Sequence, residues 1–165
     1  MLNVKIKDNS KKVRNAIKEL GNKVKPSIHK TLSYVSAFEI AQIINRTQRK
    51  GIDVNENPFK PYSIGYKRAK VKESGVVDLK DSGQMFSSLT SKITPSKGSL
   101  FFRQKSANDK AFYHDTGIGK MPKREFFSIS NKEQDKIEKL FFDRMASELG
   151  LWALEKISPP ILLAH

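Results

Sequence analysis

The chain has 165 residues, the size of one domain with a sizeable hydrophobic core. It contains no cysteine, which excludes disulfides, thiolate metal sites and cysteine nucleophiles. Its 31 Lys and Arg residues against 17 Asp and Glu residues give a formal net charge of +14, and a charge of that size attracts polyanions, so nucleic acid and acidic protein surfaces are the expected partners.

The N-terminal part of the chain predicts a strand and then a helix. Apolar and polar residues alternate over 2–6, as in a strand with one apolar face. Residues 11–24 predict an amphipathic helix, which Gly21 is placed to end. Pro26 has no backbone N–H, so we expect a helix boundary there. The apolar residues at helical spacing in this segment are Val13, Ile17 and Leu20.

The N-terminus becomes charged at once and has no apolar run, so we expect no secretory signal. There is also no run of about 20 apolar residues, the length that a membrane span needs. We therefore expect a protein that is made in a cytoplasm and has no membrane partner.

Residues 27–49 give the strongest helix prediction, and this helix is apolar on two nearly opposite faces. We expect one face to pack on the protein's own sheet. The other face can meet another helix or another subunit, and an interior helix of a monomer has the same pattern. One face carries Tyr34, Ala37, Phe38, Ala41 and Ile44, and the other carries Leu32, Val35 and Ile43 beside Glu39.

Residues 50–76 predict a loop-rich excursion, because the segment is dense in turn-forming residues. Within it, Ser63 can cap a short, strongly basic helix. A long loop in a compact domain is often a binding or assembly element, or is disordered until it binds a partner.

The next segment predicts a short helix and a hairpin. Asp81 or Ser82 can cap a helix that carries Met85, Phe86 and Leu89. The turn sequence Pro-Ser-Lys-Gly then separates two strand-like runs, as in a β-hairpin.

The C-terminal third predicts two more helices. Residues 107–117 form a short helix or turn that ends at Gly117, and Asn131 caps a long helix that Gly150 breaks. Residues 158–165 are an apolar tail, which either docks on the same chain or contacts a neighbour. The buried stripe of the long helix is expected to be Ile137, Leu140, Phe141 and Met145.

These elements predict an α+β fold for a single domain spanning 1–165. Long helices would pack on a small, mostly antiparallel β-sheet, with the long irregular loop outside it.

His114 and Asp115 are the first candidates for catalytic chemistry. Adjacent residues point in different directions on a helix or a strand, so they are poorly placed to act as a base and its orienting acid. His29 and His165 do not complete a metal-ligand spacing with His114. A structural role for His114 is therefore favoured over an acid–base or metal role.

Asp78 and Lys80 suggest a second chemistry, because an acid–x–Lys pair on a strand resembles half of a magnesium-dependent nuclease core. That chemistry also needs a second strand-end acid, and Asp53, the nearest aspartate upstream, lies in a predicted turn. The chain has no GxxxxGK[ST] phosphate loop and no GxSxG elbow. We expect no enzyme activity and no cofactor.

Four segments in a fixed order carry a resemblance to a known family. A Phe-x-Pro loop precedes a Tyr-Lys pair, and a helix start with Leu and Ser-Gly-x-Met follows. An aromatic-His-x-x-Gly element and a Pro-x-Arg-x-aromatic segment come next. The matching positions are Phe59, Pro61, Tyr66 and Lys67, then Leu79, Ser82, Gly83, Met85 and Ser88, then Tyr113, His114, Thr116 and Gly117, and finally Pro122, Arg124, Phe126 and Phe127.

Over residues 30–145 this order resembles the virion-morphogenesis and tail-completion proteins of tailed bacteriophages. The resemblance implies a structural assembly protein at the phage neck, the head–tail junction or the head-proximal end of the tail. It would act in the virion as one copy of an oligomeric ring. Expected partners are a connector, a tail terminator or a tail tube, and the packaged DNA that passes through the lumen.

The resemblance also implies a structural turn at residues 114–130. By its own chemistry, the planar guanidinium of Arg124 can grip a carboxylate or backbone carbonyls, and Phe126 or Phe127 can plug the core. Two alternatives remain open from the residues themselves. One is a basic nucleic-acid-binding protein without catalysis, and the other is the magnesium nuclease. A tail-like bacteriocin component would share the features of the virion protein.

Overall fold

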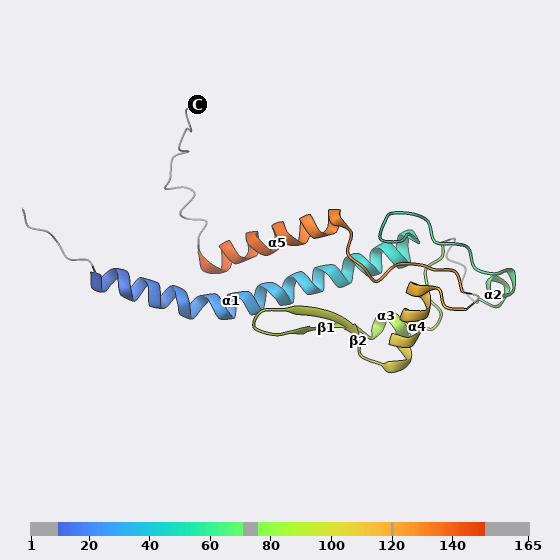
Figure 1. Cartoon of the computed structure of the whole chain (residues 1–165), viewed down its shortest axis with the longest axis horizontal. Helices are drawn as coiled ribbons and strands as arrows, with labels where there is room; N and C mark the ends of the chain where they lie inside the picture. Colours follow the sequence, from blue (N-terminus) through green and yellow to red (C-terminus); the bar gives the residue numbers. More distant parts are fainter. Residues whose placement is uncertain (1–9, 71–75, 120, 151–165) are drawn as a thin grey trace, which may run out of the picture.

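A computed structural model describes residues 10–70, 76–119 and 121–150 and has the expected α+β fold (Figure 1). The predicted strand at 2–6 and the tail at 158–165 lie outside the described residues. The helices are α1 (Ser10–Ile44), the π-helical turn η1 (Asn45–Lys50), α2 (Ile64–Ala69), α3 (Gln84–Ser87), α4 (Lys105–Thr116) and α5 (Asn131–Leu149). The strands are β1 (Leu89–Ile93) and β2 (Gly98–Phe102).

Helix α1 is one continuous helix of 35 residues, so the predictions of an end at Gly21 and a boundary at Pro26 were wrong. Both residues are exposed to solvent. The carbonyl of Asn22, which Pro26 leaves without a helical donor, lies on an exposed residue where water can bind it. The helix and its π-helical turn end at Gly51, which adopts the left-handed conformation at φ 65°.

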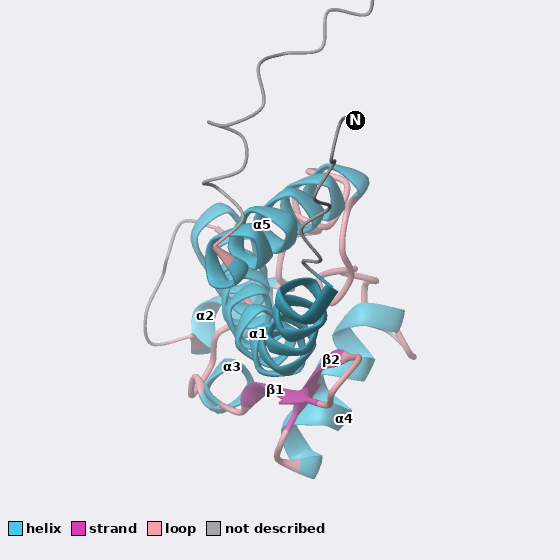
Figure 2. Cartoon of the chain, turned by 90° about the vertical axis from the view of Figure 1, so that its left-hand side faces the viewer, coloured by secondary structure: helices cyan, strands magenta, loops and turns pink. Residues whose placement is uncertain are grey.

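The C-terminal half of α1 lies between α5 on one side and the β-hairpin on the other (Figures 1 and 2). The two partners of this half of α1 are therefore the protein's own sheet and another helix. Val35 and Ile43 are buried as expected. Tyr34, Ala37 and Ala41, on the other predicted face, are exposed.

The sheet of the described residues is a two-stranded antiparallel hairpin in which Leu89 pairs with Phe102 and Ile93 with Gly98. Leu89 therefore begins a strand and is not part of the preceding helix, which ends at Ser87. At the hairpin turn, a Cβ on Gly98 would lie 2.8 Å from Ser36 Oγ of α1. Glycine thus allows the hairpin to approach the helix closely.

The hydrophobic core lies under the C-terminal end of α1, where the short helices, the hairpin and the loop before α5 converge. The ring of Phe126 packs edge-on against Phe86, with centroids 5.6 Å apart, and against Phe102 at 6.5 Å. The buried core comprises Ile43, Phe59, Leu79, Met85, Phe86, Leu89, Phe102, Ala107, Ala111 and Phe126.

Helix α5 begins with a capping box that has Ser130, and not the predicted Asn131, as its N-cap. Ser130 Oγ accepts a hydrogen bond from the Glu133 backbone N–H, and the Glu133 carboxylate accepts one from the Ser130 N–H. Gly150 ends the helix at φ 72°, as predicted. The expected stripe of α5 is only half-buried, because α5 covers one side of α1 and faces solvent on the other.

Glu39 is a buried carboxylic acid on α1, and neither of its oxygens has a hydrogen-bond partner in the described part of the chain. Burial, with a smaller contribution from the negative charge of Glu133, raises the pKa of Glu39 to about 7, against an opposing effect of Arg46. Between pH 4.5 and pH 7, Glu39 therefore keeps its proton in the folded state and loses it in the unfolded state.

Glu39→Gln is therefore expected to leave stability unchanged at pH 4, to raise it progressively between pH 4.5 and 7, and to reach its full effect above pH 7. The carboxylate of Glu39 is charged and buried above pH 7, and its ionisation there costs up to about 3 kcal/mol. Urea unfolding at pH 4 and pH 8 checks this, with the exposed Glu138→Gln as the matched control. Equal stabilities of Glu39→Gln and the parent chain at both pH values would contradict it.

Candidate functional site

The four segments of the family resemblance come together at one end of the molecule, around the hydrophobic core. Their members occupy three environments. Phe59, Leu79, Met85, Arg124 and Phe126 are buried. Gly83, His114, Gly117, Pro122 and Phe127 are half-buried, and Pro61, Tyr66, Lys67, Ser82 and Tyr113 are exposed.

Arg124 joins three of these segments. Its guanidinium donates to the Lys60 carbonyl at 3.0 and 3.2 Å and to the Pro61 carbonyl at 3.3 Å. It also lies over the ring of Tyr62, 5.3 Å from the centroid. The Arg124 backbone N–H donates to the His114 carbonyl at 2.8 Å. Arg124 thus grips backbone carbonyls, one of the two roles that its planar guanidinium predicts, and it holds the 59–62 loop against the end of α4.

Asp115 holds the segment before α5 in place. One oxygen of its carboxylate accepts hydrogen bonds from the backbone N–H groups of Phe126 and Phe127, at 2.9 and 3.0 Å. Phe126 is thereby fixed in the core. Gly117, at φ 73°, permits the reversal after α4, because a Cβ there would lie 2.7 Å from the Lys123 backbone nitrogen. The sequence offered no signal for the contact from Asp115, because its partners are main-chain groups.

His114 lies beside a small cavity of about 200 Å³ that is also lined by Tyr62, Tyr66, Asp81 and Lys110. Burial, and then the positive charge of Arg124, lowers the pKa of His114 to about 4, so its ring is neutral at physiological pH. Its Nδ1 has no hydrogen-bond partner among the described residues. The adjacent Asp115 carboxylate accepts hydrogen bonds from the backbone N–H groups of Phe126 and Phe127. Among the described residues, no hydrogen bond joins Asp115 to the His114 ring.

Asp78, the carboxylate of the nuclease hypothesis, is buried and engaged in a polar cluster. It pairs with Lys70 and accepts a hydrogen bond from the Tyr62 hydroxyl at 3.1 Å. Residues 76–80 do not form a strand, and Lys80 is exposed. Asp53 accepts from backbone N–H groups within its own turn, as its sequence setting indicated. The strand-borne acid–x–Lys arrangement is therefore not present.

A larger cavity of about 340 Å³ lies between the 58–62 loop and residues 76–77. Phe59, Tyr62 and Val77 provide apolar walls, and Lys50 and Lys70 bring positive charge to it. Lys70 is already paired with Asp78, and its ammonium lies 4.8 Å from the centroid of the Tyr62 ring. The cavity therefore adjoins the same polar cluster that fixes the 59–62 loop.

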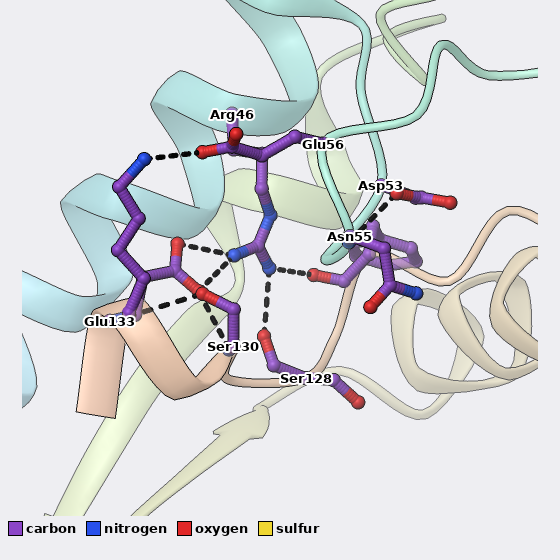
Figure 3. Close-up of polar contacts among 9 residues, drawn as sticks. Arg46, Asp53, Asn55, Glu56, Ser128, Ser130 and Glu133 are labelled. Carbon is purple, nitrogen blue, oxygen red and sulfur yellow. Dashed lines mark hydrogen bonds and ion pairs between the residues drawn. The ribbon is translucent and has the colours of Figure 1, made fainter. Parts of the chain in front are cut away.

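A second polar cluster, centred on Arg46, ties the π-helical turn η1 to the start of α5 (Figure 3). Arg46 forms an ion pair with Glu133, and its other terminal nitrogen donates to the carbonyls of Phe126 and Ser128, each at 2.8 Å. Burial raises the pKa of Glu133, but hydrogen bonds from Ser130 and Arg46 outweigh this effect and hold the pKa below its usual value. The Ser-x-x-Glu pattern at 130–133 is the sequence signal that could have located this cap in place of Asn131, whereas no signal marks Arg46 as its partner.

The N-terminal part of α1, residues 11–26, extends past the end of α5 as a helical arm (Figure 1). Every described side chain in this arm is exposed except that of Val24, which is half-buried. Over residues 11–26 the helix carries six Lys and Arg residues and one glutamate. The basic residues are Lys11, Lys12, Arg14, Lys18, Lys23 and Lys25. Sequence reasoning missed this arm, because it placed a boundary at Pro26.

The described residues include no group of three or more His, Cys, Asp or Glu side chains placed to hold a metal ion. None of the described helices combines the length and the apolar character that crossing a membrane requires. Comparison with known proteins finds no family model that matches the chain, and no curated protein or solved structure with significant similarity to it.

Proposed function

We propose that this chain is a non-enzymatic assembly protein of a tailed bacteriophage, acting at the neck or at the head-proximal end of the tail. The observation that carries the proposal is the role of the resembling residues. Arg124 binds main-chain carbonyls, Phe126 fills the core and Gly117 permits a tight reversal. Each of these residues stabilises the fold of the chain, which supports a structural role for the segments that carry the resemblance.

The exposed arm of α1 supplies such a surface. It extends beyond the body of the protein and is strongly basic. In the proposed assembly, copies of the chain form a ring in which the same weak contact recurs at every subunit. The body of one copy meets neck and tail neighbours, and the basic residues are available to an acidic partner surface or to DNA passing through the lumen.

Inactivating the gene in its parent phage or prophage tests this function. We expect filled heads with separate or malformed tails by negative-stain electron microscopy, and we expect the wild-type gene supplied in trans to restore joined particles. A gene that encodes Arg124→Ala, supplied in trans, should restore fewer joined particles, because the 59–62 loop loses its hydrogen bonds to Arg124. Normal infectious particles without the gene would overturn the proposal.

The basic arm also favours a second function, binding of nucleic acid without catalysis. Electrostatic binding of this kind weakens steeply as salt rises, with a slope set by the number of phosphates contacted. Charge reversal of Lys18 and Lys25 on the arm should lower affinity for a DNA duplex and reduce that slope. The same reversal at Lys92 and Lys97 of the hairpin, both exposed, is the control with equal net charge. Equal losses in the two variants would show that binding follows net charge and not the arm.

A further inference from the structure

An apolar stripe runs along the exposed arm of α1. Ile17 is 66% exposed and Leu20 is 44% exposed, and Val24 continues the same line at helical spacing. Large apolar side chains grouped on one helix face usually mark a surface that another element covers. No element among the described residues covers Ile17 and Leu20.

The stripe is continuous with a face of α1 that is already buried. At the same helical spacing, Ser27, Thr31 and Val35 follow Val24, and all three are buried. They lie in the part of the helix that α5 and the hairpin contact. The stripe on the arm is therefore an extension of an existing packing face.

The C-terminal end of α5 lies close to the start of this stripe. It runs antiparallel to α1, since Arg46 pairs with Glu133 at one end and Lys30 with Glu148, at 3.5 Å, at the other. Gly150 lies two positions after Glu148 and is the last described residue of this part of the chain, so the C-terminal segment is attached close to Lys30. From Lys30 to Ile17 the helix rises about 20 Å, and 15 residues span that distance even when helical.

We propose that the C-terminal segment, residues 151–165, packs along the stripe of Ile17, Leu20 and Val24 in its own chain. The composition of the segment fits this role, because only Glu155 and Lys156 carry charged side chains. Its large apolar residues are Leu151, Trp152, Leu154, Ile157, Ile161, Leu162 and Leu163.

A second copy of the arm is a poorer occupant of the same stripe. The arm is dense in Lys and Arg and carries a single glutamate, so two arms side by side repel one another. The nearly uncharged C-terminal segment brings no such repulsion. It also begins where the stripe begins, so little chain entropy is lost in bringing the two together. The inference does not depend on the proposed function, and a phage result in either direction leaves it standing.

Trp152 is the only tryptophan of the chain, so its fluorescence reports on the segment directly. We expect the full chain to show blue-shifted emission and poor access to iodide or acrylamide. Leu20→Glu, and separately Ile17→Glu, should shift the emission to longer wavelength and raise quenching. Asn22→Glu is the matched control, because Asn22 is exposed and lies on the opposite side of the helix from Leu20, so this variant should behave like the parent chain.

Far-UV circular dichroism and urea unfolding of each variant establish that the body stays folded, since Leu20 lies outside the core. Parent emission that matches the urea-unfolded chain would overturn the proposal. Equal behaviour of Leu20→Glu and Asn22→Glu would overturn it as well. Blue-shifted emission that is lost on dilution, together with dimers in light scattering, would also overturn it. That result would mean that the stripe binds the C-terminal segment of a second copy of the chain.

Discussion

Arg46→Ala is expected to destabilise the folded chain by about 3–5 kcal/mol, the usual cost of breaking a buried ion pair by removing one partner. Arg46 is 6% exposed. Its removal leaves the Glu133 carboxylate without its cation and deprives the carbonyls of Phe126 and Ser128 of a donor. Since ΔG of unfolding for a domain of this size is of the order of 5–15 kcal/mol, the loss is a large fraction of the whole.

Urea unfolding followed by circular dichroism measures this effect. Arg49→Ala is the matched control, because Arg49 lies in the same π-helical turn and is exposed. It should change stability by less than about 0.5 kcal/mol. Similar losses for the two arginine variants would contradict the role assigned to Arg46, because they would mean that helix propensity or net charge decides the result.

Phe126→Ala is the second change with a large expected effect, about 3–5 kcal/mol. Phe126 is 0% exposed and touches the rings of Phe86, Phe102 and Phe127. Alanine removes the ring and leaves a cavity among these rings, and Asp115 still holds the backbone of this segment in place through the N–H groups of Phe126 and Phe127.

The matched control for this change is Phe142→Ala on α5, where the ring is 68% exposed. We expect a change in the free energy of unfolding well below that of Phe126→Ala, and a much smaller drop in Tm. Comparable destabilisation by the two substitutions would show that the core does not centre on residue 126.

Features set by neighbouring residues were predictable from the sequence. The α+β class follows from periodicity, and Ser63 caps α2 through the Tyr66 N–H as its position suggested. The hairpin turn, the end of α4 at Gly117 and the end of α5 at Gly150 depend on local backbone preferences. The error at Pro26 also comes from a local signal. Proline favours a helix end, but here the long helix continues through it.

Contacts in the candidate site were predictable only where the chemistry of a single side chain indicates the type of group that it binds. The planar fork of Arg124 indicated a grip on carboxylates or carbonyls, but not which carbonyls. Arg46 and Glu133 are 87 positions apart, and nothing in either neighbourhood points to the other. Asp115 was considered with its neighbour His114, whereas it binds backbone groups 11 and 12 positions downstream.

The separation between Arg46 and Glu133 also bears on the order of folding. Their contact closes a loop of 87 residues that holds the hairpin, α4 and nearly all of the core. Closing such a loop costs roughly 4 kcal/mol of chain entropy, beyond a constant term. Helix α1 and the hairpin involve contacts between near neighbours and can form early, so this long closure belongs late on the folding pathway. Arg46→Ala would then increase mainly the rate of unfolding and leave the rate of folding nearly unchanged.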